Sequence, residues 1–150
     1  MPCSTACAEG YYCPAGSTAS VLQCGNASVF CPAGSGSPLA VGDGYYTSGG
    51  SDIFTRTNRL MCPSPTENSG LASYCPGDGL VHVCPSGVYG DTSGLSTSLC
   101  SGSCDPGYYC VSGSSSSRAA ACGAVNLYVY FQWRIATLWC RVLCGIVLTV

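Results

Sequence analysis

The sequence has no lysine, one histidine and few charged side chains, with five Lys and Arg residues together against seven Asp and Glu. Its formal net charge is −2, so no basic surface is available to neutralise the phosphates of a nucleic acid. The composition therefore excludes nucleic acid as a partner.

The single histidine, His82, cannot support a Ser/His/Asp or Cys/His catalytic arrangement, and its setting between Val81 and Val83 indicates a strand residue. The cysteines lack the paired spacing of a zinc finger, and the aspartates do not alternate as in a calcium loop. The dispersed aspartates, which we interpret as turn residues, are Asp43, Asp52, Asp78, Asp91 and Asp105. We expect no enzymatic activity, no metal and no cofactor.

Residues 1–123 also lack any sustained helical or strand periodicity of hydrophobic residues, so a conventional packed core is not expected. In its place the chain has 14 Cys, 20 Gly and 9 Pro. This cysteine content reaches the roughly 8–10% that marks a disulfide scaffold. We expect an extracellular or cell-surface location, with disulfides of about 2–4 kcal/mol each replacing a core.

The cysteines belong to a tandem repeat. The pattern from Cys3 to Cys13, which includes Gly10-Tyr11-Tyr12, returns 97 residues later from Cys100 to Cys110. We predict one near-complete repeat over residues 1–99, the start of a second over 100–123, and a distinct tail over 124–150. The chain begins within a repeat and without a signal peptide, so we expect a truncated N-terminus, with neighbouring repeats of the same protein as partners.

Short local patterns predict the structure of each repeat. Cys-Pro-x-Gly segments, such as the one at Cys13, predict turns with proline at the second position. The aromatic pairs before them predict strands of two to four residues, with tyrosines packed on the bridges. Residues 47–61 predict a short strand pair or a connecting loop. Asn26-Ala27-Ser28 is an N-glycosylation sequon, which predicts a glycan on Asn26.

The predicted fold is small and disulfide-rich: an elongated tandem array of short β-hairpins and turns stapled by cystines, with little helix. One segment, Cys84-Pro85-Ser86-Gly87-Val88-Tyr89-Gly90, followed by Cys100 and by Cys104 to Cys110, resembles the ephrin-receptor-like cysteine-rich module. This module is related in layout to tumour-necrosis-factor-receptor and EGF-like modules. The resemblance covers about residues 3–123 and implies an extracellular, elongated, non-catalytic module.

The resemblance also implies a pattern of disulfide bonds of the receptor type. The implied pairs are Cys7–Cys24, Cys13–Cys31, Cys62–Cys75, Cys84–Cys100 and Cys104–Cys122. Such a pattern leaves Cys3 to pair with a cysteine upstream of Met1. The sequence by itself does not fix the connectivity.

The tail is apolar from residue 127 to residue 150, which suggests a helical membrane segment. Arg134 and Arg141 interrupt it, however, and a membrane span needs about 20 apolar residues. Val129 stands where Cys31 should recur, and a reading frame shifted by one nucleotide can restore a cysteine there. The favoured hypothesis is therefore that residues 124–150 are out-of-frame or intron-derived translation, and a genuine segment is the alternative.

Together these features predict a fragment of an extracellular cysteine-rich repeat protein that serves as a structural or adhesive spacer or filament. The alternative is a membrane-anchored, receptor-like ectodomain that binds a protein or glycan ligand. Exposed aromatic clusters would favour the receptor, because exposed apolar patches mark interaction sites. Tyrosines buried against cystines would favour the spacer.

Overall fold

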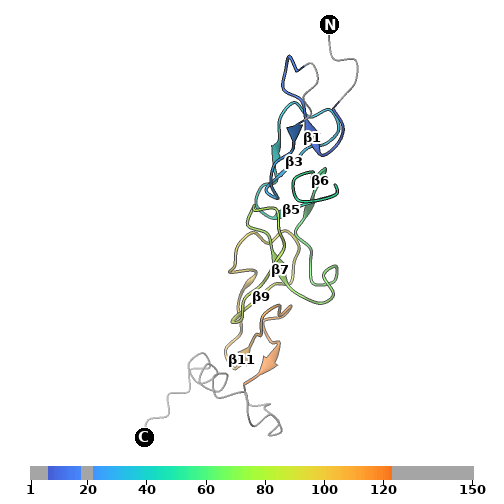
Figure 1. The fold of residues 1–150 in the computed structure, drawn as a ribbon. Coiled ribbons are helices and arrows are strands. Elements are labelled where there is room, and N and C mark those ends of the chain that lie inside the picture. The colour runs from blue at the N-terminus through green and yellow to red at the C-terminus, as the bar shows by residue number, and fades with distance from the viewer. Residues whose placement is uncertain (1–6, 18–21, 123–150) are drawn as a thin grey trace, which may run out of the picture. The chain divides into compact units, whose positions relative to one another are not determined.

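The computed structural model describes residues 7–17 and 22–122 of the chain, and these residues form short antiparallel hairpins with no helix (Figure 1). The expectations for Cys3, for Val129 and for the apolar tail lie outside the described residues. Within the described residues the predicted fold class is confirmed, since five disulfides staple short hairpins.

Across residues 7–17 and 22–122, twelve strands form six two-stranded sheets in which each strand pairs with its neighbour in sequence. The strands are β1 Tyr11–Tyr12, β2 Leu22–Gln23, β3 Val29–Phe30, β4 Leu39–Ala40, β5 Tyr45–Ser48, β6 Asn58–Met61, β7 Ser73–Tyr74, β8 His82–Val83, β9 Val88–Tyr89, β10 Gly102–Ser103, β11 Tyr108–Tyr109 and β12 Ala120–Ala121. Aromatic or β-branched residues supply most first strands, as their β-propensity predicts. Residues 47–61 contain the end of β5, all of β6 and the loop between them, so both of the expected alternatives, a strand pair and a connecting loop, are found there.

The chain divides into two compact units, each made of separate stretches of sequence. The first unit contains Met1–Pro63, Tyr74–His82 and Ser93–Thr97. The second contains Ser64–Ser73, Val83–Thr92 and Ser98–Val150. Each unit is described below by its own contacts.

The sequence repeat has a structural counterpart in the first and last hairpins. Tyr11 pairs with Gln23 in the first hairpin, and Tyr108 pairs with Ala121 in the last. These partners are related by the offsets of 97 and 98 residues that relate the cysteines. The two copies therefore fold with the same strand register.

The Cys-Pro-x-Gly turns differ from the expectation by one position. The Ser17 N–H donates to the Pro14 carbonyl at 3.0 Å, which places proline first in the turn and Gly16 third. Gly16 has a φ of 84°, and the third position of a type II turn requires a positive φ. The turn from Pro32 to Ser35 closes with the same hydrogen bond. The glycine, rather than the proline, thus fixes where these turns lie.

Cysteines make up most of the buried hydrophobic side chains among the described residues. Ten hydrophobic side chains are buried, and only Phe30, Val41 and Ala72 among them are not cysteines. Cys31, Cys62, Cys75 and Cys84 have no exposed surface. The described tyrosines are all half-buried. So small an aliphatic core cannot by itself offset the conformational entropy lost on folding, which makes the bridges essential.

Candidate functional site

The most distinctive feature of the described residues is the way in which a bridge joins one hairpin to the next. Cys24 directly follows β2, Cys31 directly follows β3, and the two are bonded with a Cα–Cα distance of 5.7 Å. Cys62, after β6, is bonded to Cys75, after β7. Cys104, after β10, is bonded to Cys110, after β11.

A glycine clasps the backbone of each of these three bridges. The Gly10 N–H donates to the Cys31 carbonyl at 2.8 Å, while the Gly10 carbonyl accepts from the Cys24 N–H at 3.1 Å. Both backbone groups of one glycine are thus bound to the two cysteines of one bridge. This arrangement, which we call the glycine clasp, gives the cystine a fixed backbone frame.

The glycine clasp recurs twice more. Gly44 donates to Cys75 at 2.9 Å and accepts from Cys62 at 2.8 Å. Gly87 donates to Cys110 at 2.9 Å and accepts from Cys104 at 3.3 Å. All three glycines have positive φ, and each precedes a strand with the sequence Tyr-Tyr or Val-Tyr. The pattern Gly-(Tyr/Val)-Tyr is therefore the sequence signal for the clasp, although β-propensity by itself predicts only the strand that follows the glycine.

Two of the implied disulfides, Cys62–Cys75 and Cys84–Cys100, are present in the structure. The implied pairs Cys7–Cys24, Cys13–Cys31 and Cys104–Cys122 are not. In their place the structure has Cys7–Cys13, Cys24–Cys31 and Cys104–Cys110. The reason is geometric: the cysteine after the last strand of one hairpin lies beside the cysteine after the first strand of the next, as Cys24 lies beside Cys31 and Cys104 beside Cys110. Cys122 is also disulfide-bonded.

Two hairpin junctions lack a bridge between the residue after the last strand of one hairpin and the residue after the first strand of the next. Val41 occupies the position after β4 where the other hairpins have cysteine, and it is completely buried. Gly90 follows β9, at the position where the three bridged junctions have the second cysteine. Cys84, which follows β8, is bonded instead to Cys100. Cys100 has a φ of 50°, a conformation uncommon for residues other than glycine.

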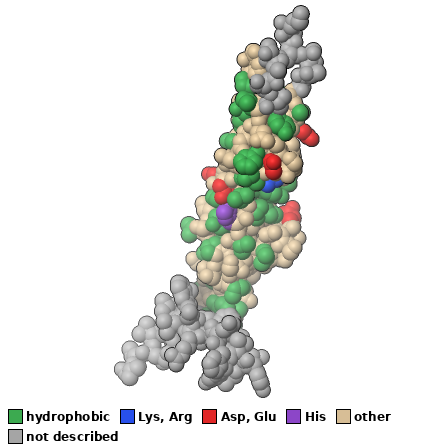
Figure 2. All heavy atoms as spheres, viewed as in Figure 1, with side chains coloured by type: hydrophobic (Ala, Val, Ile, Leu, Met, Phe, Trp, Pro, Cys, Tyr) green, Lys and Arg blue, Asp and Glu red, His purple; other side chains and the backbone are tan. Residues whose placement is uncertain are grey.

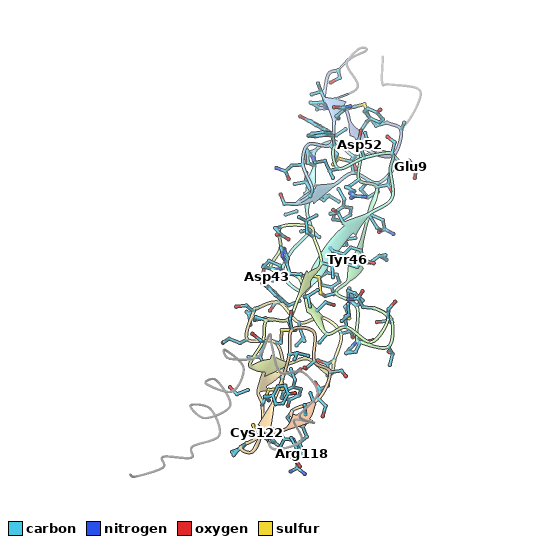
Figure 3. The ribbon with its side chains drawn as sticks, turned by 60° about the horizontal axis from the view of Figure 1, so that its bottom comes forward. Glu9, Asp43, Tyr46, Asp52, Arg118 and Cys122 are labelled. Carbon is cyan, nitrogen blue, oxygen red and sulfur yellow. A yellow bond between two sulfur atoms is a disulfide. The ribbon has the colours of Figure 1, made fainter. Side chains whose placement is uncertain are left out.

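A loop in the first unit carries two exposed apolar side chains, Ile53 and Phe54, which we call the apolar tip. Their exposed fractions are 43% and 47%. The Asp52 carboxylate accepts from the Phe54 N–H at 2.8 Å and from the Thr55 hydroxyl at 2.9 Å (Figure 3). The Gly25 N–H donates to the Phe54 carbonyl at 3.2 Å. The apolar tip is thus held outward by a structured loop.

The arginines near this loop bind their own chain. The Arg59 guanidinium lies 4.6 Å from the centre of the Tyr45 ring and 5.9 Å from that of Phe30, and it donates to the Val41 carbonyl at 3.0 Å. Arg56 donates to the Gly49 carbonyl at 3.3 Å. Arg56 thus binds the loop backbone, whereas Arg59 packs β6 on Tyr45 and Phe30 through cation–π interactions.

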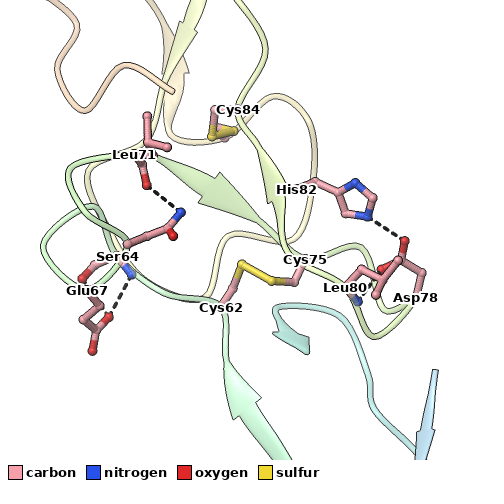
Figure 4. The surroundings of a disulfide bond; sticks show 11 residues. Cys62, Ser64, Glu67, Leu71, Cys75, Asp78, Leu80, His82 and Cys84 are labelled. Carbon is pink, nitrogen blue, oxygen red and sulfur yellow. Dashed lines mark hydrogen bonds and ion pairs between the residues drawn. A yellow bond between two sulfur atoms is a disulfide. The ribbon is translucent and has the colours of Figure 1, made fainter. Parts of the chain in front are cut away.

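His82 lies in β8, as expected for a strand residue. Its side chain is at the surface (Figure 2) and points toward Asp78 (Figure 4). Its Nε2 is 2.6 Å from the Asp78 carboxylate, and its ring stacks on Tyr74 with centroids 5.4 Å apart. The Leu80 N–H also donates to Asp78, at 2.9 Å. These contacts stabilise the turn that joins β7 to β8.

In the second unit, Arg118 and Asp105 form an exposed ion pair of 2.6 Å. The hydrogen bond from Arg118 lowers the pKa of the Asp105 carboxyl, and the same contact raises the pKa of Arg118. Because the pair is solvent-exposed, we expect little stability from it.

The described residues contain no group of three or more metal-ligating side chains and no helix of sufficient length and apolarity to cross a membrane. Comparison of the chain with protein-family models, with characterised proteins and with solved structures finds no match. The cystine framework and the exposed loops therefore carry the functional argument.

We predict that alanine at Gly10 destabilises the first unit more than alanine at Gly16. Both glycines have φ near 80°, which costs an alanine roughly 1–2 kcal/mol. A Cβ at Gly10 would also lie 2.6 Å from the Thr55 carbonyl oxygen, whereas a Cβ at Gly16 meets nothing within 4 Å. Overpacking of this kind adds about 1–3 kcal/mol. Chemical denaturation of the two oxidised variants measures the difference, and equal stability would contradict the close approach of Gly10 to Thr55.

We also predict an acid-sensitive contribution from Asp78. Burial alone would raise the pKa of Asp78, but hydrogen bonds from Leu80 and His82, with the charge of His82, hold it below its ordinary 3.8. A lowered folded-state pKa means that ionised Asp78 stabilises the fold above pH 3.8 and that this contribution is lost as the pH falls through the folded value.

The unfolding temperatures of the wild type and of Asp78→Asn should therefore differ above pH 3.8 and become equal in stronger acid. His82→Phe keeps an aromatic ring against Tyr74 but removes the Nε2 contact, so it should weaken the same pH dependence. If the unfolding temperatures of wild type and Asp78→Asn differ by the same amount at all pH values, Asp78 acts through its shape alone and the prediction is wrong.

Proposed function

We propose that this chain is part of an extracellular, non-catalytic structural spacer, of the kind implied by its resemblance to ephrin-receptor-like modules. The observation that carries the proposal is the series of glycine-clasped cystines between consecutive hairpins. The density of disulfides supports an extracellular or secreted location, because such bonds persist in oxidising compartments.

The arrangement of the bridges suits a spacer under tension. The five bridged segments follow one another along the chain without interleaving. A force applied to the chain ends cannot extend the residues that a cystine encloses, because a covalent bond resists forces that break hydrogen bonds. Each cystine therefore limits the length that the chain gains and keeps neighbouring hairpins close enough to re-form.

The composition of the interior supports the same conclusion. With few aliphatic side chains buried, stability depends on covalent closure rather than on a large cooperative core. Repeats that are stabilised mainly by contacts with adjacent hairpins can be added in series without changing the other repeats, as in other repeat proteins. Neighbouring repeats of the same protein are the partners that this proposal requires.

Force spectroscopy of the full chain between end handles tests the spacer. Removing the Cys84–Cys100 bridge with Cys84→Ser and Cys100→Ser frees a sequence separation of 16 residues, now held at a Cα–Cα distance of 6.2 Å. At about 3.3–3.6 Å per residue, the unfolded contour length should increase by roughly 50 Å. The Cys7–Cys13 bridge spans a separation of only 6 residues, so its removal should release less. Equal unfolded contour lengths for the wild type and for the two variants that lack a bridge would contradict the proposal.

A receptor-like role is the second candidate, and the apolar tip favours it. Exposed hydrophobic side chains on a structured loop are typical of binding surfaces. We expect Phe54→Ala to reduce adhesion to cells or to arrayed glycans if the receptor alternative holds, without a change in thermal stability. Leu99→Ala is the matched control, since Leu99 is 71% exposed in the second unit. If Phe54→Ala leaves adhesion unchanged, the apolar tip is not a binding surface and no longer supports a receptor-like role.

A further inference from the structure

The predicted glycosylation sequon lies inside the ring that the Cys24–Cys31 disulfide closes. Asn26 follows Cys24 by two residues, and Ser28 precedes Cys31 by three. The cysteines are separated by 7 residues in sequence. A free segment of this separation can extend to roughly 23–25 Å, but the bridge holds its ends at a Cα–Cα distance of 5.7 Å. The closed ring cannot present the sequon as an extended peptide.

The two side chains that define the sequon are bound to each other in the folded chain. The Asn26 side-chain oxygen accepts a hydrogen bond from the Ser28 N–H at 2.9 Å and another from the Ser28 hydroxyl at 2.6 Å. A transferase that recognises Asn-x-Ser must take hold of both groups. It would have to break this local turn to do so.

The backbone of the sequon is occupied as well. The Asn26 carbonyl accepts from the Val29 N–H at 3.3 Å, and the Ser28 carbonyl accepts from the Val41 N–H at 2.9 Å. Between them, the Ala27 carbonyl accepts from the buried Thr47 hydroxyl at 2.6 Å. All three carbonyls of the sequon are thus committed within the first unit. Asn26 itself is exposed, so a glycan attached earlier would project into solvent.

We propose that glycosylation of Asn26 and closure of the Cys24–Cys31 ring compete, and that the glycan can be added only while the two cysteines are still thiols. Ring closure then ends the period in which Asn26 can be modified. The proposal rests on the secretory location proposed above, and it makes the cysteine pair a redox control on the glycan content at Asn26.

The chemistry balances for both competing steps. In glycosylation, the Asn26 amide nitrogen forms a bond to the anomeric carbon of an oligosaccharide carried on a polyprenyl diphosphate. The carbon–oxygen bond to the diphosphate breaks, the diphosphate leaves with the electron pair, and the amide gives up one proton to a carboxylate of the transferase. In ring closure, Cys24 and Cys31 lose two electrons and two protons to the disulfide of an oxidoreductase, which becomes a dithiol.

The test is translation of the full chain, behind a cleavable secretion leader, into endoplasmic-reticulum microsomes with and without dithiothreitol. The readout is the fraction of chain whose mass falls on treatment with an N-glycan-removing amidase. We expect this fraction to rise with dithiothreitol for the wild type. We expect it to be high in both conditions for the Cys24→Ser, Cys31→Ser double variant, and to be lost in Ser28→Ala.

The Cys62→Ser, Cys75→Ser double variant is the matched control, because its bridge lies in the same unit but does not enclose the sequon. If this control raises the glycosylated fraction as much as the Cys24, Cys31 variant does, slow folding rather than ring closure is responsible and the proposal is wrong. An unchanged wild-type fraction, or no glycan in any variant, also overturns it. Protection of the chain from added protease reports entry into the microsomes, so failure of the secretory assumption is recognised separately.

Discussion

The covalent link between one hairpin and the next is the constraint on which the rest of this structure depends. Hairpins with strands of two residues are not stable alone in water. A cystine such as Cys24–Cys31 supplies what the strands lack, because it fixes the end of one hairpin against the first strand of the following one. The clasping glycine then satisfies the backbone groups of both cysteines. Covalent closure and hydrogen bonding thus act on the same few atoms.

Much of this architecture follows from local sequence. The strands at Tyr11 and Tyr108, the sulfur-rich interior and the repeat register could all be predicted, because each depends on residues near one another in the chain. The disulfide partners could be predicted only in part. The spacing from Cys7 to Cys13 recurs from Cys104 to Cys110 and would have favoured local pairing. The receptor-type pattern instead skips a cysteine, and only the hairpin geometry distinguishes the two.

The glycine clasp was the feature hardest to infer, since it joins positions from three different turns. Glycine in a cysteine-rich chain is usually explained by turn conformation, and Gly44 does have a positive φ. Its second role, binding Cys62 and Cys75 through its backbone, depends on the fold of two hairpins together. Val41, buried at the one junction with neither cysteine nor bridge, shows that a packed aliphatic side chain can take the place of a cystine.

A fold that depends on cystines ties its assembly to the redox state of the compartment in which it forms. Before oxidation, the segments between cysteines are open to enzymes that act on extended peptides. After oxidation, the same segments are closed turns whose carbonyls are occupied, as at Ala27. The order of oxidation and modification therefore has lasting consequences for the surface of the mature protein. At Asn26, that order decides whether the mature surface carries a glycan.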